Sequence, residues 1–277
     1  MKLGIKQKIE WYKQMPFWII GTVSWLIYSI ICIVSGADIL GMVKFFFSIP
    51  FYLILPGITL QKLLNTKDTG LRPILWILYG TSCFVFLVCV SVHFQSMLLL
   101  QLVPLALSAF CLWQIAKKGT DICNLYKNHM NQIAKGFAIW GILCVLFALF
   151  HAAQNPHPQV AGAVQLSRDL LWNIGNGRAL SQAFPAEDIR FEGVRFSYHY
   201  LTELIVAGLS LVSGASVYDI FVFFSGSVFL LGELIALYCL GRSFYYDNRK
   251  KAVALIALVF GFQCASMWGI FVQQESI

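Results

Sequence analysis

Charged residues are scarce in this sequence: Asp, Glu, Lys and Arg make up only 12% of its 277 residues, whereas 58% are hydrophobic. About a quarter of the residues of a soluble domain are charged, so this composition excludes an ordinary soluble protein. The eight cysteines are scattered, and none lies between His151 and Tyr218, so no disulfide framework is indicated. The chain also lacks a repeat of fixed period and a low-complexity tract, and neither a repeat array nor a flexible linker is indicated.

Long apolar runs are what the sequence has instead, and its mean hydropathy is +0.72. A helix of about 20 apolar residues crosses the hydrocarbon core of a bilayer, and lipid offers no partner to an open backbone. We therefore predict an all-α fold, a polytopic membrane helix bundle. About seven spans are expected, at residues 16–34, 39–60, 73–92, 97–116, 136–150, 219–240 and 252–272. The first span follows a basic head, but it is too long for a signal peptide and is expected to be a retained anchor.

The distribution of Lys and Arg predicts the topology. Basic groups at residues 2–13, 62–72, 117–135 and 242–251 fall on one side if residues 201–212 do not cross the membrane. That side is then the cytoplasm, and it holds 15 of the 20 Lys and Arg. We therefore expect residues 201–212, a run of only 12, to lie on the outer face.

Three regions follow from this topology. Residues 1–153 form five spans, residues 154–218 form an extracytoplasmic loop with juxtamembrane helices, and residues 219–277 form two further spans. The protein is expected in the cell membrane with a cytoplasmic N-terminus. The chain stops just after the last of these spans, which favours the interpretation that it is the N-terminal part of a longer protein.

One long segment of the outer loop is polar, "RDLLWNIGNGRALSQAFPAEDIRFEGVRFSYHY" at residues 168–200. Gln165, Asp169, Asn173 and Asn176 recur at helical spacing, which predicts an amphipathic helix with these residues along one stripe. Its apolar side, with Leu170, Leu171 and Ile174, suits the membrane surface, and Trp172 is a candidate interfacial anchor. We expect the helix to end before Pro185.

A second polar face follows this helix. His199 and Glu203 are spaced i, i+4, as are Tyr198 and Thr202, and this polar and aromatic face could be directed toward Asp169. A carboxylate there can act as general base on an acceptor hydroxyl, and Arg or His can stabilise a phosphate leaving group. The predicted catalytic residue is Asp169. The predicted substrate-binding residues are Asn173, Asn176, Arg178, Arg195, Tyr198, His199 and Glu203. His199 and Glu203 alone do not specify a metal site, so none is assigned, although a divalent metal is left open as a cofactor.

An Asp after a span, an amphipathic helix, "FEGVRFSYHY" and a short apolar helix together resemble the first large loop of integral-membrane GT-C glycosyltransferases. More narrowly, the loop is similar to that of bacterial multi-span relatives of the family 39 and protein-mannosyltransferase type, and the upstream "IPFYLILPGITLQKLL" is similar to an early span of such proteins. The resemblance implies an enzyme of the hexosyltransferase class. It would move a sugar from a polyprenyl-phosphate donor to a lipid, glycan or protein acceptor outside the cytoplasm, with Asp169 as base or as the group that orients the acceptor.

Two alternatives of other classes are kept. A transporter or flippase of a lipid-linked or small polar substrate would use Glu233, an acid within the sixth span, and a second span kinked at Pro50 and Pro56. A non-catalytic protein of cell-envelope assembly would need no acid in the loop. The "GNG" at residues 175–177 lacks the spacing and strand context of a nucleotide-binding loop.

Overall fold

The fold is known from a computed structural model, which describes residues 2–64, 72–118, 121–164, 166–197, 200–245, 251 and 253. The described residues form helices and no strand. The elements are α1 (Lys2–Val34), α2 (Ile39–Ile49), η1 (Pro50–Ile54), α3 (Leu55–Leu63), α4 (Arg72–His93), α5 (Leu98–Lys118), α6 (Asp121–Phe147), η2 (Ala148–Ala152), α7 (Pro158–Ala161), α8 (Arg168–Gln182), α9 (Leu201–Ser213), α10 (Val217–Asp219), η3 (Ile220–Phe224) and α11 (Ser225–Phe244), where η marks a π-helical turn.

The predicted all-α membrane bundle is confirmed. Six helical segments of the described residues are long and apolar enough to cross a membrane: Gln14–Val34, Ile39–Leu63, Pro73–His93, Leu98–Lys117, Met130–Ala152 and Val217–Phe244. They match the first six predicted spans. The seventh, at residues 252–272, falls on residues that the structure does not describe, apart from Val253. The run at 201–212 forms the short apolar helix α9 and is not among the six.

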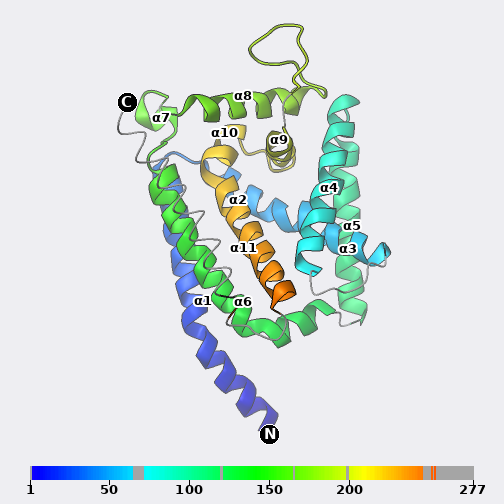
Figure 1. The fold of residues 1–277 in the computed structure, drawn as a ribbon, viewed down its shortest axis with the longest axis vertical. Helices are drawn as coiled ribbons and strands as arrows, with labels where there is room; N and C mark the ends of the chain where they lie inside the picture. The colour runs from blue at the N-terminus through cyan, green and yellow to red at the C-terminus, as the bar shows by residue number, and fades with distance from the viewer. Residues whose placement is uncertain are drawn as a thin grey trace.

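Figure 1 shows two groups of spans with α11 between them. Helices α1 and α6 run side by side, and α4 and α5 lie on the other side of α11. Two buried hydrogen bonds join the first pair to η3 and α11: the Tyr28 hydroxyl donates to the carbonyl of Phe223 at 2.6 Å, and Trp140 Nε1 donates to that of Ser227 at 2.7 Å. In lipid, a polar side chain is stable only when it has such a partner.

The second span is interrupted where its prolines stand. Pro50 begins the π-helical turn η1, which separates α2 from α3. Because proline has no N–H and its ring crowds the preceding turn, the regular hydrogen bonding of the helix breaks there. Ser108 Oγ donates to the carbonyl of Phe51, so α5 supports the interrupted segment.

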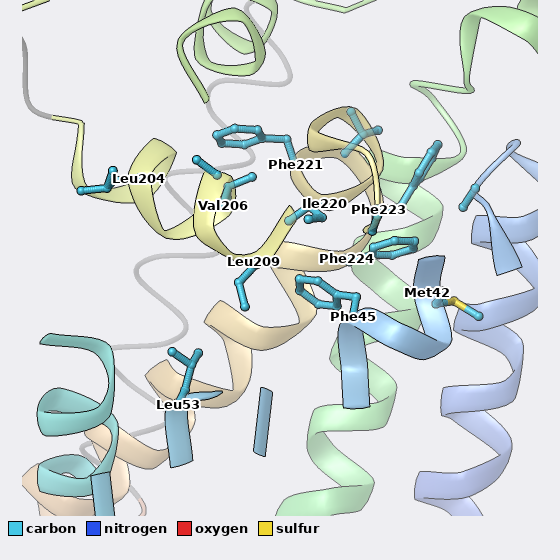
Figure 2. Close-up of a cluster of buried hydrophobic side chains, with 14 of the residues drawn as sticks. Met42, Phe45, Leu53, Leu204, Val206, Leu209, Ile220, Phe221, Phe223 and Phe224 are labelled. Carbon is cyan, nitrogen blue, oxygen red and sulfur yellow. The ribbon is translucent and has the colours of Figure 1, made fainter. Parts of the chain in front are cut away.

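The largest buried apolar cluster joins segments that are far apart in the sequence. Figure 2 shows side chains of α2, η1, α9 and η3 converging, among them Phe45, Leu209 and Phe224. Phe45 and Phe224 lie with their ring centroids 5.4 Å apart. This cluster fixes α9 and the start of the sixth span at one end of the bundle, the end across which α8 lies (Figure 1).

The opposite end of the bundle carries basic residues. The N-terminus, the end of α5 and the end of α11 all lie there (Figure 1). Helix α5 closes with Lys117 and Lys118, and Arg242 is in the last turn of α11. Such an arrangement, with basic helix ends facing away from α8, is the relative placement that the charge pattern predicts.

Candidate functional site

Helix α8 lies across one end of the bundle, on top of α9 and α10 (Figure 1). Ser167 caps its first turn by accepting a hydrogen bond from the backbone N–H of Leu170 at 3.3 Å. The helix ends at Gln182, before Pro185, as predicted. It therefore has the length and position that the sequence indicates for a surface helix beside the spans.

The two glycines of "GNG" allow close packing on two sides of α8. A Cβ on Gly177 would lie 3.0 Å from Phe221 and 3.1 Å from Val217, and a Cβ on Gly175 would lie 2.6 Å from the side chain of Ile189. A larger residue at either position would push its neighbour away. The motif thus has a packing explanation, in agreement with its rejection as a nucleotide-binding loop.

The C-terminal end of α8 is fixed by the turn between α4 and α5. Gln95 Nε2 donates to the carbonyl of Gln182 at 3.0 Å, and His93 Nδ1 donates to that of Phe184 at 2.9 Å. Gln95 adopts a left-handed backbone conformation with φ of 53°. No pattern in the sequence indicates these contacts, because nothing links the turn between two spans to the end of a helix about 90 residues later.

The polar stripe of α8 does not run along the exposed side of the helix. Asp169 in the first turn is exposed, Asn173 is half-buried, and Asn176 is buried with 1% of its surface exposed. Leu171, expected on the membrane-facing side, is 41% exposed. Gly177 must face α9 and η3 to fit, and Asn176 and Asn173 share that side of the helix, so the amides turn inward.

The buried end of this stripe lies against the start of α9. The carbonyl oxygen of Glu203 is 3.7 Å from the position of a Cβ on Gly177, and Glu203 itself is only 5% exposed. Both the oxygen and the nitrogen of the Asn176 amide lack a hydrogen-bond partner within the described part of the chain. A buried polar atom without a partner costs about 1–3 kcal/mol, so this amide destabilises the folded state.

The other predicted site residues are dispersed. Arg178 is exposed on α8, and Arg195 is exposed on the hairpin of residues 186–196, where it pairs with Glu187 in an antiparallel bridge. Tyr198 and His199 lie outside the described residues. The described structure therefore places Asn176 and Glu203 at one helix contact and leaves Asp169 at the exposed start of α8.

The 186–196 hairpin contains an ion pair that the sequence analysis missed. Arg190 Nε and Nη2 donate to the two oxygens of Asp188 at 2.9 and 2.6 Å, and the guanidinium lies 4.9 Å from the ring centroid of Trp172. Hydrogen bonds from Arg190 lower the pKa of Asp188 to about 2, and Asp188 raises the pKa of Arg190. Aspartate two residues before arginine in a polar turn was the available signal.

A second buried acid was also missed. Asp219 is 5% exposed, and its Oδ1 has no hydrogen-bond partner among the residues described. Its backbone N–H donates to Ser216 Oγ at 2.9 Å, so Ser216 caps the first turn of the sixth span. Within the described ranges, no group of three or more His, Cys, Asp or Glu is placed to hold a metal ion.

Comparison with known proteins adds no assignment. No family model, no curated protein and no solved structure matches this chain. The site therefore has to be interpreted from its own residues.

Proposed function

We propose that the protein is a membrane glycosyltransferase of the GT-C kind. It transfers a sugar from a polyprenyl-phosphate donor to a lipid, glycan or protein acceptor on the extracytoplasmic side of the cell membrane. The observation that carries the proposal is the position of α8, a helix with an exposed acid in its first turn that lies across one end of an apolar bundle. A lipid-linked donor needs this combination of a polar surface for its headgroup and an apolar bundle beside its tail.

The proposed reaction is a displacement at the anomeric carbon with inversion. Asp169 accepts the proton of the acceptor hydroxyl as its oxygen attacks the sugar, and the polyprenyl phosphate leaves with the bonding electrons. Arg178 and Arg195 are exposed near the same end of the bundle and are the candidates to stabilise the phosphate charge. Asn173, one turn after Asp169, is a candidate to orient the acceptor. In this scheme the end that carries α8 faces away from the cytoplasm, and the basic ends face the cytoplasm.

A transfer assay tests the proposal. Membranes that contain the expressed protein are supplied with labelled polyprenyl-phosphate sugars. Wild type is compared with Asp169→Asn and Glu192→Gln at equal expression. Glu192 is an exposed acid on the hairpin and is the matched control. We expect Asp169→Asn to lose at least 100-fold in transfer, the lower range for a general base, and Glu192→Gln to retain it. Equal transfer by all three proteins would reject Asp169 as the base.

One observation favours a second function, transport. Glu233 Oε1 is buried without a hydrogen-bond partner in the described structure, and Glu233 belongs to the Val217–Phe244 span. An ionisable group within a span is costly and commonly belongs to a substrate or ion path. Loss of flipping or uptake in Glu233→Gln, with Asp169→Asn unaffected, would favour the transporter over the transferase.

A further inference from the structure

The Asn176 amide has no structural task that its surroundings explain. Gly175 and Gly177 on either side fit their neighbours closely, whereas Asn176 is 1% exposed and leaves both polar atoms of its amide unpaired in the described structure. A leucine has the same branching at Cγ and would bury apolar atoms there without this cost. A buried polar group of this kind calls for a partner that is not part of the chain, either an ordered water or a bound ligand.

We propose that the Asn176 amide, at the contact between α8 and α9, is a subsite that binds the hydroxyl groups of a sugar. An asparagine amide offers two N–H donors and one acceptor oxygen, and each sugar hydroxyl both donates and accepts. That the sugar is the donor's glycosyl group rests on the proposed transferase function.

The spacing along α8 agrees with a division of roles. Asn176 follows Asp169 by two helical turns, a rise of about 10 Å at 1.5 Å per residue. At this separation the two side chains cannot contact the same atom of one hexose. A sugar held at Asn176 can, however, direct its anomeric carbon toward Asp169. Asp169 then acts on the acceptor, and Asn176 recognises the donor.

Entry of the sugar requires α8 to separate from α9, because the amide is buried in the described arrangement. The C-terminal end of α8 is held by the hydrogen bonds from Gln95 and His93, so we expect the helix to swing about that end and carry Asn176 away from α9.

Binding can be measured without turnover. The purified full chain in detergent is heated with a thiol-reactive dye, which reports unfolding through buried cysteines such as Cys32 and Cys144. The probes are polyprenyl-phosphate glucose, mannose and galactose, with unglycosylated polyprenyl phosphate as the reference. For wild type, we expect at least one glycosylated probe to raise the unfolding temperature above the value measured with unglycosylated polyprenyl phosphate. That probe should bind about 10-fold more tightly than the reference because it adds two hydrogen bonds.

Asn176→Leu should abolish the difference between the glycosylated probe and the reference, while the ligand-free protein unfolds at the wild-type temperature or above. If the Asn176→Leu variant does not fold, the same comparison is made with Asn176→Ala. Ser213→Ala is the control, because Ser213 is a buried polar residue whose hydroxyl donates to the carbonyl of Leu209 at 2.6 Å. It should lower the unfolding temperature and keep the discrimination between probes.

Two results would overturn the subsite: a wild type that does not distinguish any glycosylated probe from the reference, or an Asn176→Leu protein that still does. A buried water that satisfies the amide would produce the second result together with a lower ligand-free unfolding temperature. Failure of the transferase proposal is distinguishable, since sugar-dependent stabilisation that requires Asn176 can persist in a protein with no transfer activity.

Discussion

The contact between α3 and α4 gives a sharp test of the fold. A Cβ on Gly57 would overlap the carbonyl oxygen of Trp76 and lie 2.8 Å from its carbonyl carbon, and a Cβ on Gly80 would meet the Leu53 carbonyl in the same way. The two backbones touch, as small residues allow in membrane helix pairs. In Gly57→Ala no side-chain rotation can relieve the overlap, because the obstructing atoms belong to the backbone.

The expected loss of folding stability in Gly57→Ala follows from how the structure can relieve the overlap. Overpacking a rigid site typically costs about 1–3 kcal/mol, and a backbone obstacle favours the upper end of that range. The same substitution at Gly136 in α6 meets nothing within 4 Å. There, alanine should stabilise the helix by about 0.5–1 kcal/mol. The two variants should therefore differ by about 3–4 kcal/mol, although each adds one methyl group to a glycine within an apolar helix.

The thiol-dye unfolding assay measures this difference directly. Buried Cys111 lies on α5, which packs against α3, so its exposure reports separation of these helices. We expect Gly57→Ala to unfold several degrees below wild type and Gly136→Ala at or above wild type. Equal unfolding temperatures for the two variants would show that α3 and α4 are not in backbone contact, and would refute the packing described for this half of the bundle.

Two further predictions concern single contacts. Tyr28→Phe removes the hydrogen bond to the Phe223 carbonyl and should destabilise the protein by about 0.6–1.7 kcal/mol in the same assay, and a Tyr28→Phe protein as stable as wild type would contradict the bond. Asp188 has a pKa lowered to about 2 by Arg190, so its contribution to hairpin stability is present above its ordinary pKa of about 3.9 and is lost as the pH falls toward 2. The measurement is the rate at which pepsin cuts the hairpin at Phe191, in wild type and in Asp188→Asn. The ratio of the wild-type rate to the Asp188→Asn rate should be higher at pH 2 than at pH 4, and an equal ratio at the two pH values would count against the ion pair.

The spans could be predicted from the sequence because the bilayer imposes one dominant rule. A run such as residues 73–92 has to be a helix of about the thickness of the membrane, whatever it packs against. The same rule, together with the position of the basic residues, predicted that the short run at 201–212 does not span the membrane, and in the structure this run is the short apolar helix α9. Helix pairing depends on local shape, and nothing in the pattern showed that Gly57 and Gly80 mark a backbone contact.

The site was harder to predict because helical periodicity gives a stripe without giving its direction. Asp169, Asn173 and Asn176 do share one side of α8, as predicted, but polarity suggested that this side faces water. The direction depends on packing: Gly177 and Leu180 fit against the elements below, and the amides turn inward with them. The contacts from Gln95 and His93 were invisible for a related reason, since they join positions about 90 residues apart.

Helix α8 combines features that lower its own stability. Two glycines in a helix interior cost about 1 kcal/mol each, and a buried amide without a partner costs about 1–3 kcal/mol. Ile189 and Phe221 explain the glycines, because larger residues would separate α8 from the hairpin and from η3. No comparable contact explains Asn176, whose amide has no hydrogen-bond partner within the described part of the chain. The interpretation of this helix therefore depends on that one amide. If Asn176→Leu stabilises the protein and removes recognition of a sugar, the stability that the amide loses is explained by its role in binding.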